Sequence, residues 1–261
     1  MHVVNVLTIY AAMVINLTHC VHRIQFMNIN DQIQSVIFDI DGTLLDTLPS
    51  LAAAANELLQ LAELHTVACE ALRPGLSEGL PAFLRSALSL QPDTVPDALA
   101  QRLEATFLDQ YVGQRLSDDA VFEGVRDMLV KLRSQGLALG ICTNRDRSST
   151  EALLDGAALR GFFDTLVGMG DAAHAKPDAA PLQMAMQRLG ATPSTTLFVG
   201  DSGIDAACAD AAGVRFAAHL CGYAGSAADL YPRAMAFSAY TELSSWITER
   251  VTTHREAASH G

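Results

Sequence analysis

Short apolar runs alternate with stretches of helical periodicity along this chain, and this pattern limits the folds that it can form. Five such runs follow one another along the chain: Ser35–Phe38, Leu137–Cys142, Asp164–Val167, Thr196–Val199 and Val214–Ala218. Helical stretches precede the second and the fifth run and end at Gly136 and Gly213, the residue type that favours a left-handed helix C-terminus. Strands that alternate with helices predict a parallel sheet with helices on its faces, in an α/β fold with a Rossmann-like core.

One segment interrupts this alternation, because it holds helical patterns and no strand signal. The helices predicted within it are Ser50–Leu64, Gly79–Leu90 and Asp97–Tyr111, and Leu72–Gly79 is predicted to be a loop. The segment follows the first strand, so we interpret it as a small all-α domain inserted into the sheet domain. The predicted organisation is an α/β core at 31–47 and 121–250, a helical domain at 48–120 and a flexible polar tail at 251–261.

The first 30 residues form a predicted N-terminal extension. Their longest unbroken apolar run is Ile9–Ile15, which is shorter than the ~20 residues of a membrane-spanning helix. The first basic residue, Arg23, follows the apolar stretch, whereas a signal peptide begins with positive charge. We therefore expect no stable membrane insertion and favour Met27 as the natural initiator, and a weak membrane anchor is the alternative.

Charge and cysteine content limit the partners. Seventeen basic and 29 acidic side chains give a net charge of −12, which disfavours nucleic acid as a partner. The five cysteines are an odd number without metal-binding spacing, a pattern typical of reduced thiols in the cytoplasm. We expect a cytoplasmic monomer or homodimer that acts on a small molecule.

Polar and charged residues follow the predicted strands, at the edge where α/β folds bind ligands. Asp39 and Asp41 follow the first strand, and Asp201 and Asp205 follow the fourth. Carboxylates this close together are costly unless a cation lies between them. Hard, oxygen-seeking Mg²⁺ is the cation that such a set favours.

The remaining groups at this edge complete a set suited to phosphoryl transfer. Thr143 and Asn144 supply a hydroxyl and an amide, Lys176 supplies an ammonium, and Gly42 lets the backbone approach a ligand closely. No serine or cysteine is paired with a histidine, so Asp39 is the candidate nucleophile. Each residue alone has an ordinary explanation, such as a helix cap or a solvated loop, and the ordered set carries the interpretation.

These residues resemble the four signature motifs of the haloacid dehalogenase superfamily. The motifs are Phe38–Asp46 (FDIDGTLLD), Thr143-Asn144, Lys176–Asp178 (KPD) and Val199–Asp205 (VGDSGID). Within the superfamily, the sequence is most similar to the phosphoglycolate phosphatase group. The resemblance implies a helical cap domain between the first and second motifs, which matches the predicted insertion.

The resemblance also implies a role for each matching residue. Asp39 would be the nucleophile that forms an aspartyl-phosphate, and Asp41 the general acid and base. Thr143 and Lys176 are also predicted to be catalytic and would bind and neutralise the phosphoryl oxygens, and the predicted substrate-binding residues are Gly42, Thr43 and Asn144. The predicted Mg²⁺ ligands are Asp39, the Asp41 carbonyl and Asp201, with Asp205 as a further ligand or a support. Two positions depart from the pattern: Arg145 stands where members often carry lysine, and Glu123-Gly124 where they often carry Pro-Gly.

Substrate choice is expected to depend on the helical domain. Arg73, in the predicted loop of the helical domain, is the candidate for binding a substrate carboxylate, with a solvated surface arginine as the alternative. The leading function is a phosphatase for a small phosphomonoester, with 2-phosphoglycolate as the first candidate. A β-phosphoglucomutase-like mutase is disfavoured because residues 48–120 contain no lysine to hold a second phosphate. A non-catalytic phosphoryl-accepting protein is disfavoured because the cap and Asp41 would have no purpose in it.

Overall fold

The structure is a computed structural model, and it describes residues 32–76, 80–112, 120–224 and 226–251. The whole of the predicted N-terminal extension, including Met27, lies outside the described residues. The predicted tail also lies outside them, except for its first residue.

A six-stranded sheet forms the centre of the fold, with strand order β3-β2-β1-β4-β5-β6 and parallel pairing throughout. Its strands are β1 (Ser35–Phe38), β2 (Ala138–Asp146), β3 (Thr165–Met169), β4 (Thr196–Gly200), β5 (Arg215–His219) and β6 (Met235–Phe237). The predicted α/β fold is confirmed, and β1 has the predicted bounds. The sequence analysis missed β6, because three residues at a sheet edge are too few to show a pattern.

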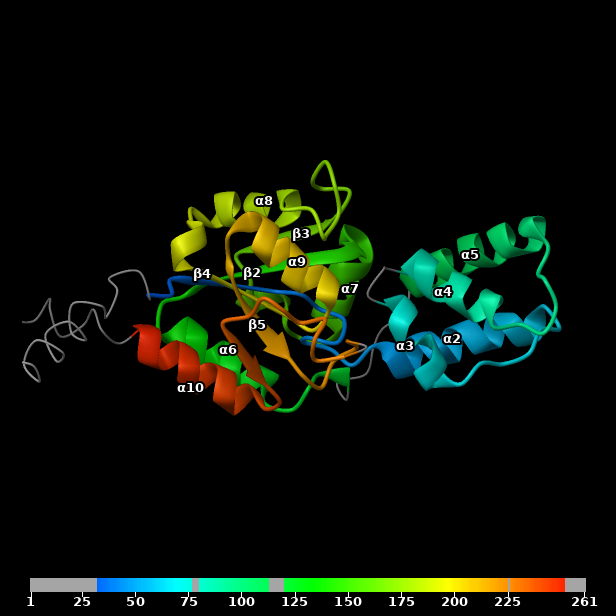
Figure 1. The fold of residues 1–261 in the computed structure, drawn as a ribbon, viewed down its shortest axis with the longest axis horizontal. Coiled ribbons are helices and arrows are strands. Elements are labelled where there is room, and N and C mark those ends of the chain that lie inside the picture. The colour runs from blue at the N-terminus through cyan, green and yellow to red at the C-terminus, as the bar shows by residue number, and fades with distance from the viewer. Residues whose placement is uncertain (1–31, 77–79, 113–119, 225, 252–261) are drawn as a thin grey trace, which may run out of the picture. The chain divides into compact units, whose positions relative to one another are not determined.

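Helices cover both faces of the sheet (Figure 1). On one side lie α6 (Val125–Ser134) and α10 (Tyr240–Val251), and on the other lie α8 (Ala180–Leu189) and α9 (Gly203–Ala212). Alternate side chains of β1 supply the two cores: Val36 and Phe38 join the first cluster and Ile37 joins the second. Both faces of β1 are therefore buried, and its carboxyl end can deliver residues to a site at the sheet edge. Helix α7 (Arg147–Gly156) follows β2.

In the described part of the chain, four helices lie between β1 and α6, and we call them the inserted helices. They are α2 (Leu48–Leu61), α3 (Cys69–Leu76), α4 (Leu80–Ser89) and α5 (Asp97–Val112). They have a hydrophobic cluster of their own, in which the rings of Phe83 and Phe107 stack with centroids 6.0 Å apart. The prediction of a loop over Leu72–Gly79 is wrong for its first part, which belongs to α3. Leu72 and Leu76, one helical turn apart, are both buried in this cluster, and that burial outweighs the local Pro74-Gly75 signal.

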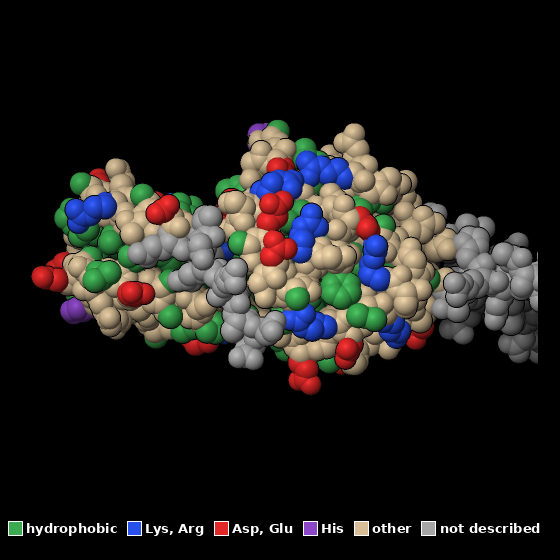
Figure 2. Space-filling view, turned by 180° about the vertical axis from the view of Figure 1, so that it is seen from behind, with side chains coloured by type: hydrophobic (Ala, Val, Ile, Leu, Met, Phe, Trp, Pro, Cys, Tyr) green, Lys and Arg blue, Asp and Glu red, His purple; other side chains and the backbone are tan. Residues whose placement is uncertain are grey.

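Basic and acidic side chains are mixed on the face of the core shown in Figure 2. Ion pairs occur in the core: Arg147 pairs with both Glu151 and Asp171. Within the described residues, no helix combines the length and the apolar composition that a bilayer crossing requires.

Candidate active site

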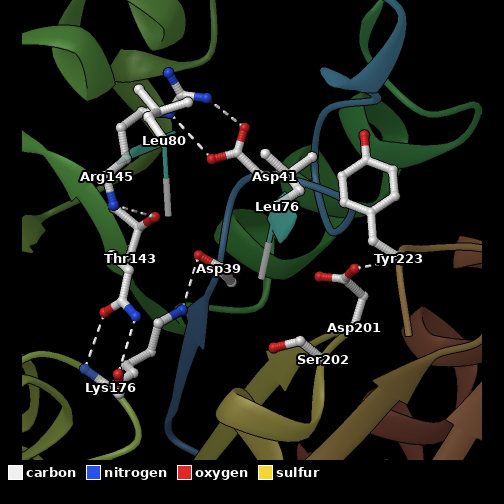
Figure 3. Close-up of a pocket in the computed structure, with 11 residues that line it drawn as sticks. Asp39, Asp41, Leu76, Leu80, Thr143, Arg145, Lys176, Asp201, Ser202 and Tyr223 are labelled. Carbon is white, nitrogen blue, oxygen red and sulfur yellow. Dashed lines mark hydrogen bonds and ion pairs between the residues drawn. The ribbon is translucent and has the colours of Figure 1, made fainter. Parts of the chain in front are cut away.

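The site begins where β1 ends. The backbone N–H of Asp39 donates to the Val199 carbonyl at 2.9 Å, so the chain is still held beside β4 at this residue. The Asp39 carboxylate lies 3.0 Å from the ammonium of Lys176 (Figure 3). Two residues further on, Asp41 also lines the pocket shown in Figure 3.

Lys176 is a buried cation of the site and comes from the loop between β3 and α8. Its ammonium lies 2.7 Å from Asp205 as well as 3.0 Å from Asp39. The side chain of Asn144 holds the backbone of this residue on both sides, since its amide oxygen accepts from the Lys176 N–H at 2.9 Å and its amide nitrogen donates to the Lys176 carbonyl at 3.0 Å. The carboxamide of Asn144 therefore positions the lysine.

Asp205 serves as an internal support at the start of α9. One oxygen accepts from Lys176, and the other accepts from the Ser202 hydroxyl at 2.6 Å and from the Ser202 N–H at 3.1 Å. Ser202 in turn caps the helix through its side chain, which completes a capping box. The carboxylate is fully buried and orients Lys176 by accepting a hydrogen bond from its ammonium.

Asp201 follows β4 directly and is held from two directions. Its carboxylate accepts from the Thr43 hydroxyl at 2.9 Å and from the Tyr223 N–H at 2.6 Å. Glycines flank it closely, since a Cβ at Gly42 would lie 2.2 Å from an Asp201 oxygen and a Cβ at Gly222 2.2 Å from its Cβ. Only glycine fits at these two positions without displacing Asp201.

The electrostatics of the acidic group favour the binding of a cation. Asp39, Asp201 and Asp205 each place an oxygen within 4.8 Å of the others, with Lys176 as their buried counter-ion. Burial raises the pKa of Asp39 to about 6, against the lowering effect of Lys176. Burial, Asp205 and Asp39 raise the pKa of Asp201 well above its usual range. Burial disfavours the Lys176 ammonium, yet Asp205 and Asp39 together raise the pKa of Lys176 well above normal. The all-oxygen, anionic donor set fits a hard divalent cation.

Asp41 has different partners. The guanidinium of Arg145 donates to both of its oxygens, from Nε at 3.0 Å and from Nη2 at 2.5 Å, and the Thr47 hydroxyl donates to one of them. The Arg145 side chain is 1% exposed and that of Asp41 15%. This two-pronged ion pair lies inside the pocket (Figure 3).

The remaining walls come from the inserted helices and from the loop after β5. Leu76 of α3 and Leu80 of α4 are apolar, and Tyr223 packs beside them in the same pocket. The Tyr223 hydroxyl donates to Asp46 at 2.8 Å and accepts from the Leu48 N–H at 3.0 Å, which ties this loop to the start of α2. The cavity volume is about 30 Å³.

The structure brings together most of the residues that the sequence singled out. Those that line the pocket are Asp39, Asp41, Thr143, Asn144, Lys176 and Asp201. Gly42, Thr43 and Asp205 are not among the lining residues and lie directly behind them, against Asp201 or Lys176.

Arg73 is not among the described residues that line the pocket. It sits within α3, where its guanidinium pairs with Glu70 and donates to the Gly222 carbonyl at 3.0 Å. Its position thus links an inserted helix to the loop behind Asp201.

Other pocket residues were not predicted as site residues: Leu76, Leu80, Arg145, Ser202 and Tyr223. Arg145 was visible as a departure from the pattern beside Thr143-Asn144. Tyr223 has no local signal, because only the fold brings its N–H to Asp201, 22 residues away in sequence.

Residues 36–219 match the family described as haloacid dehalogenase-like hydrolase, and the chain belongs to this family. It is 38% identical over 190 residues to a phosphoglycolate phosphatase of Pseudomonas putida KT2440, with 72% of this chain and 70% of that protein covered. A phosphoglycolate phosphatase of Rhodospirillum rubrum is 32% identical over 218 residues, with 82% of this chain and 90% of that protein covered. The chain is thus an enzyme of a hydrolase family and is similar to phosphatases.

A solved structure shares the fold. The crystal structure of a predicted phosphoglycolate phosphatase from Haemophilus somnus 129PT superimposes with a TM-score of 0.73 at 22% identity, covering 81% of this chain and 96% of that one.

Proposed function

We propose that this enzyme is a Mg²⁺-dependent phosphatase that hydrolyses a small phosphomonoester, with 2-phosphoglycolate as the leading substrate, through an aspartyl-phosphate. The observation that carries the proposal is the buried Lys176 ammonium, 3.0 Å from Asp39 and 2.7 Å from Asp205. It supports a role for Lys176 in neutralising phosphoryl charge beside Asp39 as the nucleophile. Burial of both groups strengthens that neutralisation.

The reaction has two displacements. In the first, an Asp39 oxygen forms a bond to phosphorus while the ester oxygen leaves with a proton from Asp41. In the second, Asp41 takes a proton from a water molecule whose oxygen attacks the same phosphorus. The bond to Asp39 breaks, and inorganic phosphate and the free carboxylate are produced.

The proposed ligands for Mg²⁺ are Asp39, the Asp41 backbone carbonyl and Asp201, with Asp205 as a support. When bound, the ion would supply positive charge to the phosphoryl oxygens. Thr43 and the close glycines Gly42 and Gly222 keep Asp201 in place for this role. We assign Thr143 to the phosphoryl oxygens as well, since it lines the same pocket as Asp39.

The substrate assignment is supported by the lining of the pocket. The inserted helices contribute apolar Leu76 and Leu80 to the described lining, which favours a small ligand and excludes water from the reacting bond. The similarity to enzymes named phosphoglycolate phosphatase supports a two-carbon phosphorylated acid. We also propose a cytoplasmic site of action, because the four cysteines that the structure describes are free thiols.

A mutase is the second candidate and fits less well. A mutase has to hold a second phosphate, whereas the described lining from the inserted helices carries no charge. Arg85 pairs with Glu104 away from this pocket, and Arg73 pairs with Glu70.

Covalent trapping tests the chemistry. The enzyme is mixed with Mg²⁺ and 2-phosphoglycolate, quenched in acid and reduced with borohydride, which converts an acyl phosphate to an alcohol. Peptide mass spectrometry should then find homoserine at position 39, and no such product in Asp39→Asn. Full turnover with no modification at Asp39, or with modification elsewhere, would overturn the mechanism.

A further inference from the structure

Two cationic side chains line the described part of the pocket, Lys176 and Arg145. They belong to separate ion pairs. Lys176 lies between Asp39 and Asp205, at the nucleophile, whereas Arg145 binds Asp41. The pocket therefore offers a second cationic position besides the one assigned to the phosphoryl group.

Arg145 lies at a β-bulge in β2 and lines the pocket. β2 pairs regularly with β3 as far as Cys142 opposite Val167 and pairs again at Asp146 opposite Met169, so residues 143–146 face only 168–169. Such an insertion redirects side chains and is common beside active sites. Gly168 makes room for it, because a Cβ there would lie 2.9 Å from the Arg145 carbonyl oxygen.

The guanidinium is already arranged to receive a carboxylate. Nε and Nη2 donate to the two oxygens of Asp41, at 3.0 and 2.5 Å, which is the two-pronged geometry that arginine forms with carboxylates. Thr47 also donates to Asp41, so this carboxylate keeps a partner if the guanidinium turns to another anion. An exchange of one carboxylate for another on Arg145 leaves its buried charge paired throughout.

We propose that Arg145 is the specificity-determining residue that binds the carboxylate of the substrate, and that this carboxylate takes the place of Asp41 on the guanidinium. The inference rests on the proposed function and adds the recognition of the second anionic group. The phosphoryl group lies at Lys176 and the carboxylate at Arg145, so a molecule with both anions and a short link between them fits the two cations of the pocket.

The other arginines considered for this role have different surroundings. Arg73 pairs with Glu70 and lies outside the described lining. Arg85 is on α4 with its side chain 58% exposed and pairs with Glu104. We therefore assign the carboxylate to Arg145, which lines the pocket, in preference to Arg73, the residue expected from the sequence.

The test uses two unreactive ligands, so it does not depend on catalysis by Asp41. The ligand 3-phosphonopropionate carries a phosphonate and a carboxylate, and propylphosphonate carries the phosphonate alone. Titration calorimetry in Mg²⁺ measures the Kd of each for the wild type, Arg145→Gln, Arg145→Lys and Arg147→Gln. Arg147→Gln is the matched control, since it removes the same charge two residues away, where Arg147 pairs with Asp171 outside the pocket.

We expect the wild type and Arg147→Gln to bind 3-phosphonopropionate about 10- to 100-fold more tightly than propylphosphonate, the range for hydrogen bonds to a charged group. In Arg145→Gln this ratio should fall to about one, while the Kd of propylphosphonate changes little. Arg145→Lys should retain part of the ratio and keeps the test valid if the glutamine variant does not fold.

The outcomes separate the two proposals. A wild type that prefers the carboxylated ligand, with the same preference in Arg145→Gln, overturns the role of Arg145 and leaves the substrate proposal standing. A wild type without any preference overturns both the role of Arg145 and 2-phosphoglycolate as the substrate. A loss of affinity for both ligands by the same factor in Arg145→Gln would reduce Arg145 to a structural support and contradict the inference.

Discussion

The position of Asp201 depends on a glycine that is distant in sequence, and Gly222→Ala tests this dependence. A Cβ at residue 222 would lie 2.2 Å from the Asp201 Cβ and 2.4 Å from one of its oxygens. Reaching an ordinary contact of at least 3.4 Å requires a displacement of about 1.2 Å. Asp201 cannot move this far without loss of its hydrogen bonds to Thr43 and Tyr223, at 2.9 and 2.6 Å.

A shift of about 1 Å at a reacting centre costs about 100-fold in rate, and overpacking costs about 2 kcal/mol of stability. We expect kcat/KM for 2-phosphoglycolate to fall about 100-fold, the half-saturating Mg²⁺ concentration to rise, and Tm to fall by about 4–8 °C. The measurements are phosphate release across a Mg²⁺ series and thermal unfolding by circular dichroism.

Gly161→Ala is the matched control, because its Cβ would have no neighbour within 4 Å. This variant should have wild-type activity and an unchanged or slightly higher Tm. If Gly222→Ala also had wild-type kcat/KM and an unchanged Mg²⁺ requirement, the assignment of Asp201 as a metal ligand held by close packing would be refuted.

Three further predictions follow from the charges of the site. Asp39→Asn should lower kcat by at least ~1,000-fold. Burial raises the pKa of Asp39 to about 6 from 3.8, so the ionised carboxylate destabilises the fold above that pH. In EDTA, Asp39→Asn should therefore have a higher Tm than the wild type at pH 7.5, and the difference should close toward pH 4. A lower Tm of the variant at pH 7.5 would contradict this. Asp205→Asn removes a buried carboxylate partner of Lys176 and should lower Tm by about 10 °C. Asp210→Asn, on the exposed side of α9, should leave Tm unchanged. Equal melting curves for the two variants would refute the role of Asp205 as a support. Addition of Mg²⁺ at ~100 times its Kd should stabilise the EDTA-treated protein by about 2.7 kcal/mol, measured as a Tm rise of about 5–10 °C. Asp201→Asn should lack this rise. A rise of equal size in that variant would show that the ion binds elsewhere.

The sheet and the acidic positions of the site were predictable because local patterns carry them. β1 is fully buried, and its residues Val36–Phe38 form a continuous apolar run that ends directly at Asp39. Parallel strands bring their carboxyl ends to one edge, and this rule is sufficient to bring Asp39 and Asp201 together.

Contacts between segments far apart in sequence were not predictable. The pair of Arg145 with Asp41 joins residues 104 positions apart, and it depends on a bulge that no composition signal marks. α3 was missed in part, because Pro74-Gly75 reads locally as a turn, whereas burial of Leu72 and Leu76 against the other inserted helices stabilises a helix there. Tertiary packing decided both cases.

Phosphate release from a panel of phosphomonoesters tests the central claim most directly. The panel holds 2-phosphoglycolate, nucleoside monophosphates, pyrophosphate and sugar phosphates, each assayed with Mg²⁺ and with EDTA. We predict a kcat/KM for 2-phosphoglycolate of ~10⁴ M⁻¹s⁻¹ or more, well above that for the other compounds, and none in EDTA. Equal, weak and EDTA-sensitive release from all compounds would contradict the substrate, and release that EDTA leaves unchanged would contradict the metal-dependent mechanism.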